Sequence, residues 1–452
     1  MQRPATDWHG RRLHFVGIGG AGMSGLALVA RRLGAAVTGS DRAAGTSPTH
    51  ARLRAAGIEP ATGHAAANVP DGPDVEVVVS TAIPPENPER AAARERGLRE
   101  LHRAELLGEL TRLKPTIAVT GTHGKTTTSS MIVHALTGAG LDPSYLVGGE
   151  VRSTGTNAAW ETGEWLVVEA DESDRSLLRL APAIAVLTNA ELDHDDVYAS
   201  QRDVAAVFRD FLALAREAVV WDRPALRAIA AAAGTPTVAY DVPAPELRPG
   251  GSAFELDGTR VELAVPGAHN ALNAAAALTA CGLAGADPEA TAAALRGFVG
   301  AGRRFEELGG TPAGALVVDD YAHHPTEVRA TLEAARTLAP RRVVAVFQPH
   351  LYSRTARHAL EFGAALALAD VIVVLEVYAA RERREDHPGV SGRLVAEAAA
   401  DAAGGKTVAW LPGFDEAWRF LSAELREGDL CLTLGAGDVD ALGRLLLGGG
   451  PA

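Results

Sequence analysis

Short apolar runs alternate with amphipathic segments along most of the chain, and this alternation predicts a parallel α/β architecture. In the first hundred residues the expected elements are strands at 13–18, 36–38 and 75–80 and a helix at 23–33. Strand, helix and strand at this spacing are typical of a βαβ unit. A polar, proline-containing stretch at 84–100 and a short helix near Leu106 complete this part of the chain.

The same pattern starts again after Lys114-Pro115. The expected elements are strands at 116–120, 165–170 and 183–188, and helices at 203–215 and 271–283. In the first of these helices the apolar residues recur at helical spacing. The stretch 241–253 is rich in proline and glycine, so we expect it to be a surface connection.

A third α/β pattern follows Gly300. Strands are expected at 315–319, 342–347, 371–375 and 429–434, with amphipathic helices between them. The charged run 381–386 is expected to be a solvated loop. A chain of 452 residues also favours three domains, at about 150 residues each. We therefore predict three α/β domains, with the bounds 1–113, 114–299 and 300–452.

Composition and charge exclude several classes of protein. The chain is 47% apolar and 22% charged, which indicates a globular protein rather than a disordered polymer. Its net charge of −13 argues against a general basic surface for nucleic acid. Any polyanionic ligand must therefore be bound by local groups.

Cysteine content and hydropathy indicate the compartment. Cys281 and Cys431 are the only cysteines, which excludes a disulfide framework and a four-cysteine zinc site. The first ten residues hold no apolar core of signal-peptide length, and no later run reaches about 18 apolar residues. We expect a cytoplasmic protein that does not span a membrane.

The first glycine-rich turn, Gly17-Ile18-Gly19-Gly20-Ala21-Gly22, lies between an expected strand and an expected helix. It matches G-x-G-x-x-G, whose N–H groups face a diphosphate at a helix N-terminus. Asp41 lies about 20 residues further on, where dinucleotide-binding folds place their ribose acid. Taken alone, this motif predicts NAD and hence an NAD-dependent dehydrogenase. The alternative is a tight turn that needs glycine only for packing.

The second glycine-rich turn is Thr120–Thr128, again between an expected strand and an expected helix. It is shorter than the usual P-loop, because Val119 stands where the first glycine of that motif belongs. Its backbone N–H groups can surround phosphate oxygens, Lys125 can reach the terminal phosphates, and the Thr126 hydroxyl can bind Mg²⁺. A lysine at a helix start that simply faces solvent is the alternative.

Acidic residues follow two further strands, at 169–174 and 189–196, and the second group includes His194. Ends of parallel strands share one edge of a sheet, so these groups should meet the P-loop there. Clustered carboxylates repel one another unless a cation neutralises them, and Mg²⁺ suits oxygen ligands and phosphates. Alternatively, some of the acids at 171–174 cap a helix.

In the third domain, His, Tyr and Arg residues follow two strands, at 319–325 and 348–354. They are candidates for contact with an anionic substrate, although a structural role fits each one equally well.

Together, these motifs resemble those of the Mur ligases. The matching segments are 14–25, 120–128, 169–174, 269–273, 302–306, 320–325 and 348–355. The resemblance implies an N-terminal Rossmann-like UDP-binding domain, a central P-loop ATPase domain and a C-terminal Rossmann-like domain. It also implies an ATP-dependent ligase that activates a carboxylate as an acyl phosphate for attack by an amine. The glycine run of the first motif points to the alanine-adding branch, with UDP-N-acetylmuramate, ATP and L-alanine as substrates.

The resemblance also implies roles for individual residues. The residues expected to bind the UDP-sugar are Gly17, Gly19, Gly20, Ala21, Gly22, Met23, Asp41 and Ser80. The residues expected to bind ATP are Gly121, Thr122, His123, Gly124, Lys125, Thr126, Thr127, Asn270, Asn273, Arg304 and Asp320. The expected Mg²⁺ ligands are Thr126, Glu169 and His194. The expected catalytic residues are Lys125, Glu169 and His194. The sugar-linked carboxylate and the amino acid would meet His324, His350 and Arg354.

Two positions depart from the family pattern. Leu351 stands where an arginine is common, and the stretch 190–220 contains no lysine, so we predict no carbamylated lysine. Three alternative functions stay open: a ligase that adds a preformed tripeptide to the same UDP-sugar, an NAD-dependent dehydrogenase, and a non-catalytic UDP-sugar sensor. The sequence also leaves open whether the protein is a monomer or a homodimer.

Overall fold

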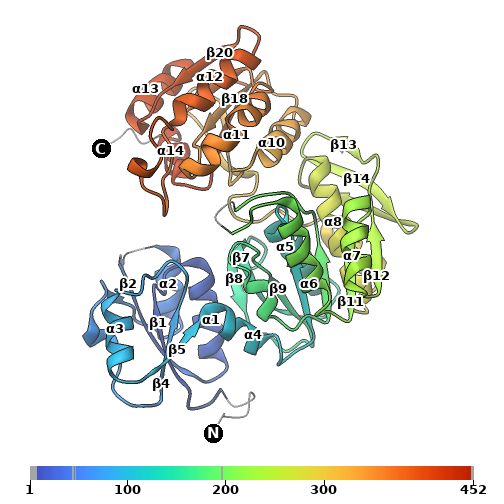
Figure 1. Cartoon of the computed structure of the whole chain (residues 1–452). Helices are drawn as coiled ribbons and strands as arrows, with labels where there is room; N and C mark the ends of the chain where they lie inside the picture. The colour runs from blue at the N-terminus through green and yellow to red at the C-terminus, as the bar shows by residue number, and fades with distance from the viewer. Residues whose placement is uncertain (1–7, 43–44, 46, 195–196, 449–452) are drawn as a thin grey trace. The chain divides into compact units, whose positions relative to one another are not determined.

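The computed structural model describes residues 8–42, 45, 47–194 and 197–448. It divides into two compact units (Figure 1). The first unit holds Met1–Asp241 and Asn273–Ala294, and the second holds Val242–Leu272 and Leu295–Ala452. Each predicted domain contains its own mainly parallel sheet, and the predicted boundaries themselves stay a prediction.

The first sheet is fully parallel, in the order β3-β2-β1-β4-β5. Its strands are β1 (Arg12–Val16), β2 (Ala36–Asp41), β3 (Ala61–Thr62), β4 (Val75–Val79) and β5 (Arg99–His102). The helices are α1 (Ala21–Arg32), α2 (Pro48–Ala55), α3 (Pro88–Glu95) and α4 (Arg103–Leu110), with a 3₁₀ turn at Ala66–Asn68. The central strand β1 buries Leu13 and Phe15, so the expected βαβ unit is confirmed.

Helix α3 lies in the stretch 84–100, which the apolar pattern left without an element. Its sequence has only small apolar residues, Ala92 and Ala93, to bury, so it lacks a strong apolar stripe. Local chemistry at its start forms it instead: the Asn87 side chain accepts the Glu89 and Arg90 N–H groups, and Pro88 occupies the first turn.

The second sheet has seven strands in the order β12-β11-β10-β6-β9-β7-β8, of which only β8 is antiparallel. The strands are β6 (Thr116–Thr120), β7 (Ser144–Val151), β8 (Thr156–Ala159), β9 (Leu166–Glu169), β10 (Ile184–Leu187), β11 (Glu217–Trp221) and β12 (Thr237–Tyr240). The helices are α5 (Lys125–Gly138), α6 (Gln201–Leu212) and α7 (Pro224–Ala233), with a 3₁₀ turn at Ser176–Arg179. Strand β6 is buried along its whole length and lies between β10 and β9.

The expected surface connection at 241–253 is wrong in part, because it holds strands. An antiparallel sheet of β13 (Glu246–Arg248), β14 (Gly251–Leu256) and β15 (Thr259–Leu263) begins there. The Pro249-Gly250 pair forms the turn of its first hairpin, with Gly250 at φ +73°. A strand of three residues is too short to show alternation, so only its turn was visible in the sequence. Helices α8 (Ala268–Leu283) and α9 (Pro288–Leu295) follow.

The third α/β sheet has the order β16-β17-β21-β18-β19-β20, with only β16 antiparallel. Its strands are β16 (Glu306–Gly310), β17 (Leu316–Asp320), β18 (Arg342–Phe347), β19 (Val371–Val374), β20 (Thr407–Trp410) and β21 (Asp429–Leu434). The helices are α10 (Pro325–Thr337), α11 (Tyr352–Leu366), α12 (Gly392–Ala402), α13 (Phe414–Glu424) and α14 (Val439–Leu446). One apolar cluster covers each face of the sheet, as expected for buried parallel strands.

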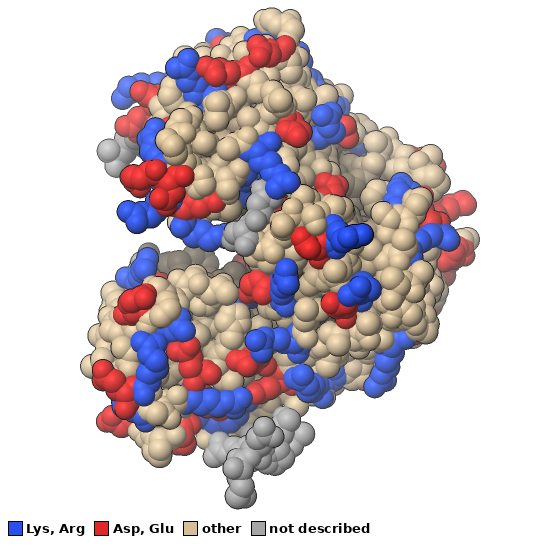
Figure 2. All heavy atoms as spheres, viewed as in Figure 1, with Lys and Arg blue, Asp and Glu red and all other residues tan. Residues whose placement is uncertain are grey.

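Charges of both signs are interspersed over the face in Figure 2, in keeping with the expected lack of a general basic surface. The run 381–386 is mainly an exposed loop, as expected, with one 3₁₀ turn at Arg384–Asp386. Among the described residues, no helix is long and apolar enough to cross a membrane.

Candidate functional site

The first glycine loop leads from β1 into α1 and is held by the strand beside it. The N–H groups of Gly17 and Ile18 donate to the Ser40 carbonyl at 2.8 and 2.9 Å. The Gly19 N–H donates to the Asp41 carboxylate at 2.8 Å. A Cβ atom on Gly19 would lie 2.7 Å from that carboxylate, so a larger residue would displace the Asp41 side chain. Asp41 thus binds the loop backbone in this structure, and its contact with a ribose stays a prediction.

The predicted UDP-sugar residues lie at one edge of the first sheet. The segment from Gly17 to Met23 follows β1, Asp41 ends β2 and Ser80 follows β4, and these three strands are neighbours. The chain places β2 and β3 on one side of β1 and then crosses to place β4 and β5 on the other side, which makes the edge at β1 and β4 a topological switch point. Ligands of open α/β sheets bind at such points.

A buried carboxylate lies behind this loop. Glu89 of α3 is fully buried and accepts hydrogen bonds from Ser40 Oγ and Asn68 Nδ2, both at 2.7 Å. His14 Nε2 of β1 lies 3.2 Å from it. Burial alone would raise the pKa of Glu89, but the hydrogen bonds of His14, Ser40 and Asn68 outweigh burial and lower it to about 2. An ionised Glu89 therefore ties β1 and β2 together beneath the loop.

The second glycine loop leads from β6 into α5 and is shaped by the residues that follow β10. Gly121 has φ +134°, and a Cβ atom there would collide with Thr188 Oγ1. The Thr188 hydroxyl donates to the His123 carbonyl at 2.6 Å, and the Asn189 side chain accepts the His123 N–H at 2.8 Å. Gly124, at φ +81°, is the N-cap of α5. The loop is thus held by Thr188 and Asn189, and it leads directly into α5 through Gly124.

Lys125 lies at the start of α5 among backbone carbonyls and acids. Its Nζ donates to the Gly121 carbonyl at 2.7 Å and to Glu172 Oε1 at 2.9 Å. Burial lowers the pKa of Lys125, but the nearby Glu172, Asp171 and Glu169 carboxylates raise it more, so the net shift is upward. Lys125 therefore carries its charge at neutral pH, as a phosphate-binding lysine must.

Two of the predicted metal ligands come together. The Thr126 hydroxyl donates to Glu169 Oε2 at 2.9 Å, and the Gly148 N–H donates to the same oxygen at 2.8 Å. A Cβ atom on Gly148 would lie 2.7 Å from Glu169. These oxygens at the P-loop are the donor type that Mg²⁺ prefers.

His194, the third predicted ligand, follows β10 on the other side of β6. Its backbone has φ +57°, and its Nε2 lies 3.6 Å from Glu172 Oε1. His194 Nδ1 and Glu172 Oε2 are buried, and neither has a hydrogen-bond partner among the described residues. The structure therefore brings His194 to Glu172, which the sequence did not distinguish from the other acids of 169–174. Asp195 and Asp196 lie outside the described residues.

Two other acids of 169–174 have local roles. Asp171 Oδ1 accepts the Ser173 N–H, and Asp174 Oδ1 accepts the Ser176 N–H at the start of a 3₁₀ turn. The N-cap residue of this turn is Arg175, so the alternative that some of these acids cap a helix stays a prediction. Their other oxygens bind the guanidinium of Arg103, a residue that no sequence motif identified.

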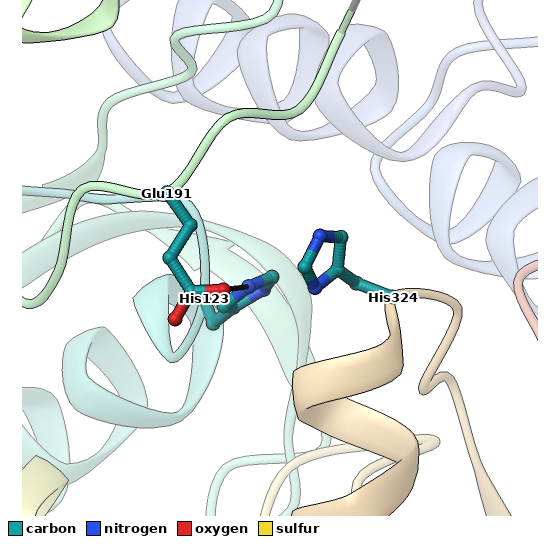
Figure 3. Close-up of side chains that lie close together, drawn as sticks. All are labelled: His123, Glu191 and His324. Carbon is teal, nitrogen blue, oxygen red and sulfur yellow. Dashed lines mark hydrogen bonds and ion pairs between the residues drawn. The ribbon is translucent and has the colours of Figure 1, made fainter. Parts of the chain in front are cut away.

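His123 of the P-loop faces an acid of the next loop. Figure 3 shows its ring beside the Glu191 carboxylate, with His123 Nε2 3.3 Å from Glu191 Oε2. Glu191 is held in turn through its N–H, which donates to the Thr122 hydroxyl at 2.9 Å. His324, also drawn there, belongs to the second unit, where it is the N-cap of α10.

The predicted asparagines lie on α8, three residues apart and so on one helix face. Asn273 reaches the P-loop, because a Cβ atom on Gly124 would lie 2.5 Å from Asn273 Oδ1. Asn270 is buried, and its Nδ2 donates to the Pro266 carbonyl at 2.8 Å.

In the second unit, Arg304 and Asp320 lie near the carboxyl end of β17. The Asp320 carboxylate accepts the N–H groups of Phe305 and Ala322, both at 2.8 Å. Burial raises the pKa of Asp320 to about 6, against the opposing charge of Arg304. The Arg304 guanidinium lies 5.1 Å from the ring centroid of Tyr321.

His350 and Arg354 adjoin each other after β18. Arg354 Nη1 lies 3.1 Å from His350 Nδ1, and the His350 ring stacks on Tyr378 at 5.9 Å. Between them, Leu351 has φ +67° and is 4% exposed. The Leu351 side chain is therefore part of the packing, and this position offers no cation.

Three family models match the chain in succession. The Mur ligase family catalytic domain matches residues 12–115, the Mur ligase middle domain 119–281, and the Mur ligase glutamate ligase domain 303–437.

Two relatives that match over nearly the whole chain have the same name. A UDP-N-acetylmuramate–L-alanine ligase of Kineococcus radiotolerans is 49% identical, with 96% of this chain and 94% of that protein covered. The protein of that name from Mycolicibacterium smegmatis is 46% identical, with 97% and 94% covered.

Two solved structures are similar over nearly the whole chain. The UDP-N-acetylmuramate–alanine ligase of Thermotoga maritima has a TM-score of 0.81 at 29% identity, with 96% of this chain and 98% of that chain covered. A murein peptide ligase of Psychrobacter arcticus has a TM-score of 0.72 at 26% identity, with 98% and 100% covered. The NAD prediction made from the first glycine loop alone is therefore wrong, because that loop lies within the first Mur ligase match. The chain belongs to the Mur ligase family.

Proposed function

We propose that this protein is the ATP-dependent ligase that joins L-alanine to the carboxylate of UDP-N-acetylmuramate, with ADP and phosphate as the other products. The reaction belongs to peptidoglycan precursor synthesis, and hence to cell-wall formation, cell shape and division. The observation that carries the proposal is the pair of glycine loops in the first unit, each at the carboxyl edge of a parallel sheet. One loop suits a diphosphate and the other a triphosphate. The names of the full-length relatives support the same activity.

The reaction proceeds in two balanced steps. A carboxylate oxygen of the acceptor attacks the γ-phosphorus of ATP, the bond to the β-phosphate oxygen breaks, and ADP leaves. The amine of L-alanine then attacks the acyl carbon, and phosphate leaves as the amide forms and a proton is lost. Lys125 and the N–H groups of Gly121–Thr127 stabilise the charge that develops on the phosphoryl oxygens.

A divalent cation fits the residues beside the P-loop. Thr126 and Glu169 offer adjacent oxygens, and Glu172 Oε2 and His194 Nδ1 are buried atoms that the described protein does not pair. Thr126, Glu169 and His194 would hold Mg²⁺, which neutralises phosphate charge when bound. Removal of Mg²⁺ with EDTA should abolish ADP release and leave UDP-N-acetylmuramate binding within about twofold. Equal loss of both would contradict this metal site.

The second unit holds further candidates for substrate contact. Arg304 and Asp320 are suited to contact the nucleotide, since one is cationic and the other lies at a strand end. His324, His350 and Arg354 are suited to the sugar-linked carboxylate and the incoming amino acid. We place the reaction in the cytoplasm, where ATP is available and the two buried cysteines stay unpaired.

The decisive experiment supplies UDP-N-acetylmuramate, ATP and Mg²⁺ with each amine in turn and measures ADP release. L-Alanine should give rapid turnover, with glycine and L-serine slower and the peptide L-Ala-γ-D-Glu-meso-diaminopimelate inactive. Faster turnover with that tripeptide would instead assign the recycling function. Binding of both nucleotides without an amide product would assign a sensor. Sedimentation of the same sample distinguishes a monomer from a homodimer.

A further inference from the structure

A pocket of about 200 Å³ lies within the first unit, between α1 and α4 on one side and β7 and β9 on the other. Ala21 and Gly22, from the end of the first glycine loop, line one wall. Glu169, beside the P-loop, lines another. The pocket therefore extends from the end of the first loop to Glu169, whose carboxylate accepts the Thr126 hydroxyl of the second loop.

The position of this pocket matches the connectivity of the proposed acceptor. In UDP-N-acetylmuramate, the sugar and its lactyl group lie between the diphosphate and the carboxylate that must reach the γ-phosphorus. A molecule bound to the first loop and reacting at the second must therefore pass through the space between them. The carboxylate end of the acceptor belongs beside Glu169 and Asp171, which line the pocket.

The charges around the pocket make this an unfavourable place for an acid unless a cation is present. Glu169 and Asp171 both contribute carboxylates, while Arg103 is the one cationic side chain among the described lining residues. Arg103 stands in the first turn of α4, and a Cβ atom on Gly22 would lie 3.5 Å from its Nη1. An approaching carboxylate thus meets one guanidinium and two like charges.

The Arg103 guanidinium is held so that part of it stays available. Nη2 donates to Asp171 at 3.1 Å and to Asp174 at 3.2 Å. Nε and Nη1 make no hydrogen bond within the described part of the chain. Both double-donor edges of a guanidinium include Nη2, so Nε–H and Nη1–H can each donate a single charge-assisted hydrogen bond to a carboxylate.

We propose that Arg103 is the specificity-determining residue that binds the lactyl carboxylate of UDP-N-acetylmuramate, and so distinguishes it from UDP-sugars without that acid. This inference rests on the proposed function and adds the residue that selects the acceptor. Asp171 and Asp174 position the guanidinium from the loop that also faces Lys125.

The test compares UDP-N-acetylmuramate with UDP-N-acetylglucosamine, which lacks the lactyl carboxylate. Binding is measured by calorimetry on the full chain without nucleotide and in EDTA, so that no metal contributes. The wild type should prefer the acid. Arg103→Ala should reduce that preference by roughly 10- to 100-fold and leave binding of UDP-N-acetylglucosamine within about twofold. Arg103→Lys should restore only part of the preference, because one ammonium does not bind Asp171 and Asp174 and also reach the carboxylate as the planar guanidinium does.

Arg52→Ala is the matched control. Arg52 also pairs with an acid of the neighbouring sheet, Glu150, at 2.6 Å, but it does not line the pocket. Its replacement should leave the preference unchanged. Equal weakening of both ligands by Arg103→Ala, or an unchanged preference, would overturn the inference. Wild-type ADP release with L-alanine is measured in parallel: its absence would overturn the proposed function, whereas its presence with an unchanged preference would overturn only the role of Arg103.

Discussion

Lys125 owes its charge to its neighbours. The ammonium is enclosed by loop carbonyls and by Glu172, with Asp171 and Glu169 nearby, and their combined field outweighs the cost of burial. The same acids would repel a nucleotide if Lys125 were lost. One residue therefore determines whether phosphate can approach this edge of the sheet.

Replacement of Lys125 by alanine should lower ADP release by at least about 100-fold, because it removes a cation from the transferred phosphoryl group. Binding of UDP-N-acetylmuramate should stay within about twofold, since the first glycine loop is untouched. Enzyme assays and calorimetry measure the two effects. Lys406→Ala is the control, as Lys406 belongs to the second unit and binds the Ala367 and Ala369 carbonyls. Substantial residual turnover in Lys125→Ala would contradict the assignment.

At the scale of elements, buried polar contacts hold the strands that adjoin the first glycine loop. The Glu89 network joins α3 to β1 and β2, the two strands whose ends form the first loop. The apolar pattern predicted both strands because each is a short buried run. It missed α3, whose contribution to the core is a carboxylate and two alanines rather than a stripe.

Glu89→Gln should destabilise the first sheet by about 3 kcal/mol, because it breaks a buried charged network. The pKa of Glu89 is lower in the folded protein, about 2, than its ordinary value of 4.5. Its contribution is therefore complete above pH 4.5 and is lost as the pH falls toward 2. Hydrogen exchange of β1 and β2 amides, measured from pH 7 to pH 3, checks both effects. The difference between wild type and variant should shrink toward pH 3, and a constant difference would refute the network's role.

The chain as a whole consists of two compact units that do not coincide with its three predicted α/β patterns. Both glycine loops lie in the first unit, whereas the predicted Arg304, Asp320 and His350 lie in the second. Helix α8 contributes to both, with Asn270 in one unit and Asn273 in the other. Spatial contacts, rather than the restart of a strand–helix pattern, define these units.

Because the residues predicted to bind the UDP group all lie in the first unit, UDP-N-acetylmuramate should stabilise that unit more than the second. At 100 times its Kd, a ligand adds about 2.7 kcal/mol to the unit that binds it. Hydrogen exchange with and without the ligand should slow in β1, β2 and β6 and stay unchanged in β19 and β20. Protection of equal size throughout the second unit would show that the units do not respond separately.

The sequence by itself determined the three α/β patterns, both glycine loops and the family, because apolar periodicity and turn chemistry are encoded within a few neighbouring residues. Only the tertiary structure decided which acids meet which cations. Lys125 and Glu172 are 47 residues apart, and Arg103 and Asp171 are 68 apart. Parallel strand pairing brings such distant positions to one sheet edge, and no local pattern distinguishes Glu172 from the acids beside it.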